Sequence, residues 1–247
     1  MNGACLKFEK PIRDSISRIR FAPQSNNLLI SSWDASLRLY DVGSYNLRLE
    51  TPTEAALLDC CFPQESVAFT TDSDGYIRRC DLQYGINEKI GSHDDLATCV
   101  EYSDETWFVV GSIDGRVALK YIYSFNSGND GYVFRCQPKA KDGRHHLAAV
   151  NDISFSPSIC GTFVTGDDKG HVITWDAKSK KRLFELPRHL NSIASLSYNC
   201  GGQLLAVASS FTYQEANELE EPPQIYIHEM DERYIGSGSA SSSSNKT

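Results

Sequence analysis

The chain has 247 residues, of which 40% are hydrophobic, and its formal net charge at pH 7 is −8. Such a length and apolar content are enough for a folded core. The negative charge argues against general binding to nucleic acid or to an anionic membrane surface. No run of about 20 apolar residues could span a bilayer, and the first residues lack the pattern of a signal peptide. We therefore expect a soluble intracellular domain with no direct nucleic-acid or membrane partner.

A short strand, a tight polar turn and a second strand recur along the chain. In the first copy, Leu28–Asp41, apolar and polar residues alternate on both sides of Asp34 and Ala35. Later copies occupy 67–81, 108–121 and 163–176, and each has a glycine in its turn. Because turn residues of this kind supply the backbone angles that a tight reversal needs, each copy predicts a β-hairpin.

An additional strand with alternating apolar residues precedes each hairpin, and a fifth copy of that strand begins at Ile193. Units of this kind with a period of about 40 residues are typical of the blades of a WD40 β-propeller. Trp175-Asp176 is a literal Trp-Asp ending. The pattern predicts an all-β propeller in one domain over residues 8–230. Its readable blades are at about 16–42, 55–82, 97–122, 150–177 and 192–230.

The number of blades is unusual, because five can be identified whereas WD40 rings most often have seven. The third unit is also abrupt, since Glu101–Thr106 leads directly into Trp107 with little room for a turn. Two interpretations follow from the residues alone. Either the chain forms a compact five-bladed ring, or an internal segment has been removed near residues 103–108, as in an alternatively spliced form.

Several segments resemble one family, the budding-uninhibited-by-benzimidazoles propellers of the mitotic spindle checkpoint. The resemblance is most specific in the last blade and its acidic loop, and it extends to the first and fifth family blades. The segments that carry it are 181–198, 204–213, Glu215–Pro223, Ser31–Asp41, Gly111–Leu119 and Tyr132–Cys136. Since this family is seven-bladed, the resemblance implies that about two blades are absent near residues 103–108.

The resemblance implies a non-enzymatic adaptor that is located in the nucleus and acts at the kinetochore in mitosis. A cytoplasmic location is also compatible with the resemblance. Its implied partners are a checkpoint kinase or kinase-like protein, a ubiquitin-ligase checkpoint complex and a phosphorylated kinetochore scaffold. A related propeller family acts in messenger-RNA export at the nuclear pore and stays as the alternative. A propeller enzyme would need a catalytic cluster on one face, and the sequence shows no such motif.

Two arginines are the predicted phosphopeptide-binding residues. In the family, phosphothreonine in Met-Glu-Leu-Thr repeats of the scaffold is held by one basic residue in the Gly-Arg-Val strand and one in the aromatic-Phe-basic-Cys strand. These positions correspond to Arg116 and Arg135. Guanidinium groups suit this role because they bind phosphate with paired, charge-assisted hydrogen bonds.

Trp33 and Lys120 are the predicted partner-peptide-binding residues. The family uses a tryptophan in the turn that contains Trp33 to pack a partner segment, the GLEBS motif. Family members often have a glutamate where this chain has Lys120. Because opposite charges attract across interfaces and like charges repel, the reversal predicts weakened GLEBS binding.

No cofactor or metal is expected. The eight cysteines lack the spacing of zinc ligands and are interpreted as reduced thiols. His145-His146 lies in a polar loop, and His93 matches a structural position of WD40 blades. The tail at 234–247 is rich in serine and glycine, which predicts disorder.

Overall fold

The computed structural model describes residues 3–8, 11–92, 107–111, 115–121, 132–136, 148–211 and 222–230, and within these ranges the secondary structure is strands and turns without helix. The strands are β1 (Ala4–Cys5), β2 (Ile16–Phe21), β3 (Asn27–Ser32), β4 (Ser36–Asp41), β5 (Asn46–Pro52), β6 (Leu57–Gln64), β7 (Val67–Asp72), β8 (Tyr76–Asp81), β9 (Ile86–Ser92), β10 (Trp107–Gly111), β11 (Arg116–Tyr121), β12 (Tyr132–Arg135), β13 (Val150–Phe155), β14 (Thr162–Asp167), β15 (Val172–Asp176), β16 (Lys181–Glu185), β17 (Ile193–Tyr198), β18 (Leu204–Ser209) and β19 (Gln224–Glu229).

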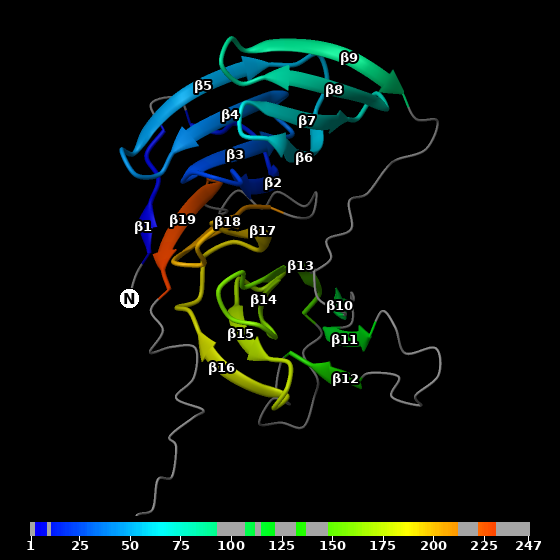
Figure 1. The fold of residues 1–247 in the computed structure, drawn as a ribbon, viewed down its shortest axis with the longest axis vertical. Coiled ribbons are helices and arrows are strands. Elements are labelled where there is room, and N and C mark those ends of the chain that lie inside the picture. Colours follow the sequence, from blue (N-terminus) through cyan, green and yellow to red (C-terminus); the bar gives the residue numbers. More distant parts are fainter. Residues whose placement is uncertain are drawn as a thin grey trace, which may run out of the picture.

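The described strands form five antiparallel sheets, which are the blades of a propeller (Figure 1). Their strand orders are β2-β3-β4-β5, β6-β7-β8-β9, β10-β11-β12, β13-β14-β15-β16 and β1-β19-β18-β17. In each sheet the strand that comes first in the repeat lies innermost, toward the common centre (Figure 1). The prediction of an all-β propeller with five readable blades is confirmed.

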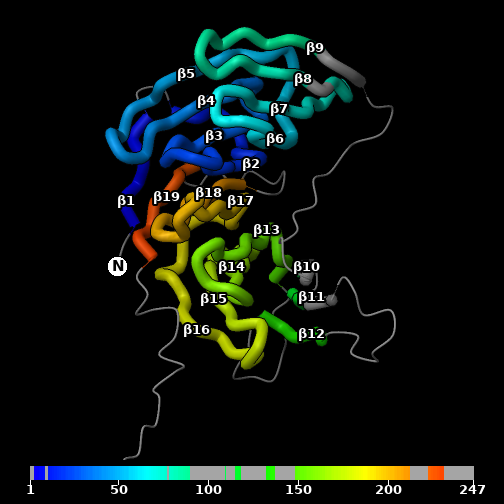
Figure 2. Tube along the Cα trace, viewed as in Figure 1, coloured from blue at the N-terminus to red at the C-terminus, as the bar shows by residue number. Residues whose placement is uncertain are grey.

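Apolar clusters fill the contacts between neighbouring sheets. One cluster joins the β17–β19 strands to the β2–β5 sheet, and others join β2–β5 to β6–β9, β13–β16 to β17–β19, and β10–β12 to β13–β16. The sheets therefore follow one another in an arc from β6–β9 to β10–β12 (Figure 2). In the described part of the chain, the two end sheets make at most marginal contact with each other.

Burial along the middle strands shows which sheet faces lack a neighbour. All six residues of β14 are buried, as are five of the six in β3, because sheets pack on both of their faces. In β7, by contrast, Phe69 and Thr71 are half-buried while Ala68 and Thr70 are buried. Since successive side chains point to opposite faces of a strand, one face of the β6–β9 sheet is only partly covered.

The N-terminal strand completes the last blade. Ala4 of β1 pairs with Ile227 of β19, and Cys5 pairs with Tyr226. The Leu6 amide continues this edge by donating a 2.9 Å hydrogen bond to the Ile225 carbonyl. The first and last segments of the fold are thereby joined in one sheet. The hairpin pattern of the sequence did not predict this pairing.

The aspartate that ends the third strand of a blade fixes the next turn. Asp41, Asp81 and Asp176 each accept hydrogen bonds from two backbone amides, those of the second and third residues after them. Burial acts to raise the pKa of Asp41, but the bonds from Ser44 and Gly43 outweigh it and lower the pKa. The Asp of the Trp-Asp ending is therefore a turn-forming residue.

The turn between β3 and β4 leads to the first prediction. Ala35 has φ +57°, whereas three other blades place Gly75, Gly115 and Gly170 at the same turn position. A residue with a Cβ pays roughly 1–2 kcal/mol for left-handed backbone angles, and glycine avoids this strain. Glycine also gives the unfolded chain more conformational entropy, which offsets about 0.4–1 kcal/mol of the gain. We therefore expect Ala35→Gly to raise the free energy of unfolding by about 0.5–1 kcal/mol, measured by urea denaturation. Ala56→Gly, at a position without positive φ, should lower the free energy of unfolding. A loss of the same size in both variants would contradict backbone strain at Ala35.

Candidate functional site

Arg116 and Arg135 face each other across two paired strands. Arg116 is the first residue of β11, and the register of β11 with β12 places it directly opposite Arg135. The backbone around the pair is fixed on both sides. The Cys136 amide donates a 3.0 Å bond to the Gly115 carbonyl. A Cβ on Gly115 would lie 2.7 Å from the carbonyl oxygen of Ala148, so the turn before Arg116 packs directly on the chain next to it.

The two arginines lie on the face of the β10–β12 sheet that is turned away from the β13–β16 sheet, here called its outer face. Arg116 is exposed and Arg135 half-buried, whereas the alternate residues Val117 and Cys136 are buried against the β13–β16 sheet. Val133 lies two residues from Arg135 on the same strand and is 61% exposed. A shallow depression of about 320 Å³ is lined by Arg116, Val133, Phe134 and Arg135. The face therefore combines two positive charges with a small apolar surface.

This register concentrates positive charge on a protein of net charge −8. Side chains directly opposite in an antiparallel pair have Cβ atoms about 5 Å apart. An anion bound between the two guanidinium groups would accept hydrogen bonds from both forks. The arrangement thus suits a doubly charged oxyanion such as a phosphate group.

Trp33 lies in the turn between β3 and β4 and is 48% exposed. Its amide donates a 2.9 Å bond to the Ser15 carbonyl. The neighbouring Asp34 accepts bonds from the Arg38 guanidinium at 2.9 Å and from the Arg13 amide at 3.1 Å. Burial acts to raise the pKa of Asp34, but hydrogen bonds from Arg38 and Ser36 lower it below its usual value. The turn therefore presents the indole from a fixed backbone.

The structure does not bring Trp33 and the two arginines into one site. Trp33 belongs to the β2–β5 sheet and the arginines to the β10–β12 sheet, and two other sheets stand between them in the arc. Lys120 lies in β11 opposite Phe108 of β10. Its side chain is outside the described residues, so the effect of its charge stays a prediction.

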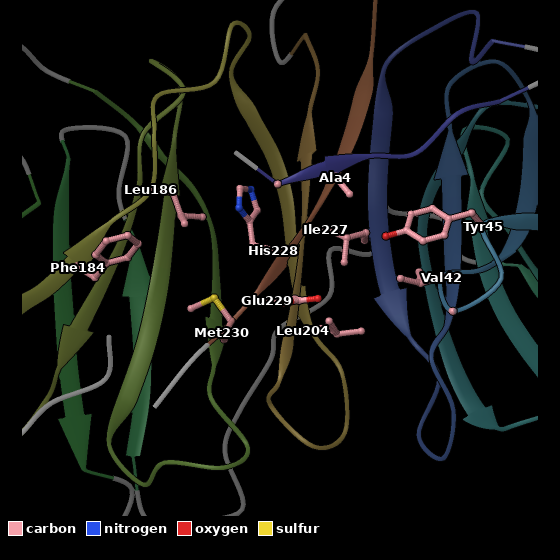
Figure 3. Close-up of a pocket in the computed structure, with 12 residues that line it drawn as sticks. Ala4, Val42, Tyr45, Phe184, Leu186, Leu204, Ile227, His228, Glu229 and Met230 are labelled. Carbon is pink, nitrogen blue, oxygen red and sulfur yellow. The ribbon is translucent and has the colours of Figure 1, made fainter. Parts of the chain in front are cut away.

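A second cavity, of about 450 Å³, lies beside the N-terminal strand (Figure 3). Its lining is mostly apolar, and Figure 3 shows side chains from three blades around it, among them Leu186, Ile227 and Tyr45. His228 is its buried titratable group, and burial together with neighbouring His189 lowers the pKa of His228 to about 4. None of the predicted site residues lies here. The strand pattern around His228 gave no signal that this histidine would lie beside His189 and line a cavity.

The described ranges hold no group of three or more potential metal ligands. Seven cysteines are described, and all are free. Burial raises the pKa of the Cys60 thiol to about 12 and that of Cys80 to about 11, so both are protonated and weakly reactive at neutral pH. His93, His145-His146 and the tail at 234–247 lie outside the described residues. No described segment is a helix long and apolar enough to cross a membrane.

Comparisons with known proteins agree with the fold. Residues 5–41 match the family model for the WD domain, G-beta repeat. The chain is 41% identical to mitotic checkpoint protein BUB3.3 of Arabidopsis thaliana, over 93% of this chain and all of that protein. It is 28% identical to BUB3.1 of the same plant, over 92% of this chain and 93% of that protein. The protein Rae1 of Drosophila melanogaster is also 28% identical, over 83% of this chain and 62% of that protein.

The length of the first of these alignments bears on the predicted absence of two blades. It spans 314 positions, whereas 93% of the 247 residues is about 230. About 84 aligned positions therefore have no residue in this chain, which is close to two WD40 repeats of about 40–45 residues each. This length supports the prediction that two blades are absent. The predicted junction at 103–108 falls largely outside the described residues.

Proposed function

The chain belongs to the BUB3 family of mitotic checkpoint WD40 adaptors, and on that basis we propose that Arg116 and Arg135 dock it on a phosphorylated kinetochore scaffold. The ligand is a phosphothreonine in a Met-Glu-Leu-Thr segment. The observation that carries the proposal is the register that sets the two arginines directly opposite each other on an outer sheet face.

The physical basis is charge and geometry together. A phosphothreonine carries about −1.5 to −2 charges at pH 7 and three strong acceptor oxygens. Two guanidinium forks on adjacent strands can share these oxygens, and a hydroxyl group in the same place offers neither the charge nor the number of acceptors. The site therefore discriminates phosphorylated from unphosphorylated peptide without any catalytic group.

The second prediction tests this function directly. Fluorescence anisotropy with a phosphorylated Met-Glu-Leu-Thr peptide should show that Arg116→Ala and Arg135→Ala each weaken binding about tenfold or more, because each removes hydrogen bonds to a charged group worth about 1.5–3 kcal/mol. Arg79→Ala is the matched control, since Arg79 lies in the third strand of another blade and is 40% exposed. It should leave the affinity unchanged.

Two outcomes contradict the proposal. One is equal affinity of the protein for the phosphorylated and unphosphorylated peptides. The other is a loss in the Arg79→Ala control that matches the loss in the two site variants. Circular dichroism melts of all three variants establish that any difference arises in a folded protein.

We propose Trp33 as a contact for a partner segment of the GLEBS type, carried by a checkpoint kinase or kinase-like protein. Its 48% exposure on a fixed turn supports this role. We also propose a ubiquitin-ligase checkpoint complex as a partner, and the nucleus and the mitotic kinetochore as the places where the protein acts. The messenger-RNA export alternative has weaker support, because the Poly(A)+ RNA export protein of Schizosaccharomyces pombe is 22% identical to this chain and BUB3.3 is 41% identical. Co-purification with nucleoporins in place of kinetochore scaffold would favour that alternative.

A further inference from the structure

Four inner strands carry a polar side chain at the same position, the third residue of the strand. In each of these strands the pairing register shifts immediately before that residue, which marks a β-bulge. Bulges re-aim the side chain beside them. The residues concerned are Arg18 of β2, Asp59 of β6, Asp152 of β13 and Ser195 of β17. Because the inner strands surround the common centre (Figure 1), the repeat directs these four side chains toward it.

Arg18 contacts two carboxylates from two different sheets. Its Nε lies 3.0 Å from Asp59 Oδ1, and its Nη1 lies 3.0 Å from Asp152 Oδ1. The other oxygen of Asp152 accepts bonds from Ser195 Oγ at 2.9 Å and from the Leu196 amide at 2.8 Å. The Arg18 guanidinium thereby connects three sheets, and Asp152 adds the sheet of β17 as a fourth. The sheets of Arg18 and Asp152 are not neighbours in the arc, because the sheet of β17 lies between them.

The network is largely shielded from water. The side chains of Arg18, Asp59 and Asp152 are 18%, 10% and 9% exposed. Burial acts to lower the pKa of Arg18, but Asp152 and Asp59 raise it above its usual value, so the guanidinium is charged. Asp59 Oδ2 is buried and has no hydrogen-bond partner. Its other oxygen, Oδ1, accepts hydrogen bonds from Arg18 Nε and from the Cys60 amide.

We propose that Arg18 is an axial brace that sets the curvature of the arc formed by the described sheets, a role that goes beyond partner docking. In a closed ring, each blade is held by neighbours on both sides. In a stack where each unit contacts only its neighbours, the end units are the least restrained. Arg18 links the end sheet β6–β9, through Asp59, to the β13–β16 sheet on which the other end sheet packs. The brace thus limits the opening between the two end sheets, here called the seam.

The width of the seam can be measured as the distance between two exposed positions, one on each end sheet. Cys61 of β6 is exposed, and Val133 of β12 is 61% exposed. Spin labels on Cys61 and on Val133→Cys, with the other accessible cysteines changed to serine, report the distance across the seam by double electron–electron resonance. Arg18→Met should lengthen this distance and broaden its distribution. The same change should lower the melting temperature by roughly 6–20 °C, as expected when a buried charge pair loses one partner.

Two further variants make the test specific. Asp152→Asn keeps the shape and the Ser195 contact but removes the charge, so it should also widen the seam, and its effect should be less than additive with Arg18→Met. Arg79→Met breaks an exposed pair in which Arg79 Nη1 and Glu88 Oε2 are 3.9 Å apart, and it should change neither the distance nor the melting temperature by more than about 2 °C.

A lower melting temperature with an unchanged distance distribution would overturn the brace, because it would show a contribution to stability alone. Additive effects of Arg18→Met and Asp152→Asn would overturn it as well. If Arg18→Met does not fold, Arg18→Lys decides by the same two measurements. A single ammonium cannot fork to both carboxylates in the way a guanidinium does, so the lysine variant should show an intermediate widening, and an unchanged distance would contradict the proposal.

Discussion

Gly170→Ala should lower the free energy of unfolding by about 1.5–4 kcal/mol. Gly170 has φ +83°, where a Cβ costs roughly 1–2 kcal/mol, and the smaller chain entropy of unfolded alanine offsets part of this, which leaves about 0.5–1 kcal/mol. The added Cβ would also lie 2.4 Å from the carbonyl oxygen of His189 and 2.8 Å from that of Asn191. Both are backbone atoms and cannot rotate away. The loop that precedes β17 would have to move, which adds about 1–3 kcal/mol.

Gly161→Ala is the matched control for Gly170→Ala. Gly161 has φ +78°, but a Cβ there would have no atom nearer than 3.8 Å, and the nearest belong to the flexible Lys178 side chain. The control therefore has the backbone strain without the overlap, and we expect a loss of about 0.5–1 kcal/mol once the chain entropy of unfolded glycine is counted. Urea denaturation of both variants at pH 7 gives the comparison. Equal losses in the two variants would show that the close approach at Gly170 has no energetic effect.

The hairpins of this fold were predictable because their determinants are local. Asp74-Gly75 between two alternating segments predicts a reversal, and the structure has β7 and β8 on either side with Gly75 at φ +79°. The same holds for the turn at Lys169-Gly170 between β14 and β15. In each case the residues that bend the chain lie within the segment that bends, so no distant contact decides the outcome.

Contacts between distant segments were not predictable from the pattern. The β1 strand has two residues, too few for an alternation to be recognised, and its partner β19 lies more than 200 positions along the chain. The same is true of the Arg18 contacts. Asp59 and Asp152 interrupt apolar alternation in their strands, and that irregularity was the available signal. It does not reveal which charge the two carboxylates meet.

The candidate phosphopeptide site depended on a resemblance for its residues and on the structure for its geometry. An arginine at the start of a strand is a common surface residue, and nothing in the local sequence pairs Arg116 with Arg135. Their pairing requires the register of β11 and β12, in which Val117 lies opposite Phe134. That register follows from Val117 and Phe134 packing with Trp175 of the next sheet, a tertiary contact that strand alternation alone cannot specify.

Acidification should destabilise the protein between about pH 6.5 and pH 4, because two buried histidines must take up protons on unfolding. His189 and His228 are 7% and 5% exposed, and their Nε2 atoms are 3.4 Å apart. Burial lowers the pKa of both rings, and that of His228 falls to about 4. Both rings are therefore neutral in the folded protein at pH 7. His228 also lines the cavity beside the N-terminal strand (Figure 3).

The direction of the pH dependence follows from proton uptake by the histidines on unfolding. An unfolded histidine has a pKa of about 6.5, so below that pH the unfolded chain binds protons that the folded chain excludes. Stability contributed by the neutral rings is complete above about pH 6.5 and is lost as the pH falls toward the folded value. For His228 alone, the loss between pH 7 and pH 5 should be about 2 kcal/mol, and His189 acts in the same direction. Urea denaturation at pH 7, 6, 5.5 and 5 measures it.

His228→Gln separates this effect from other titrations. Glutamine keeps a hydrogen-bonding group near His189 but takes up no proton, so the slope of stability against pH between 7 and 5 should be clearly smaller than in the parent protein. Asp41→Asn is the control. The folded pKa of Asp41 is lowered, so its contribution is lost in more acidic solution, and this variant should keep the parent slope above pH 5. Parallel curves for His228→Gln and the parent protein would show that proton uptake at this buried pair does not control the acid sensitivity of the fold.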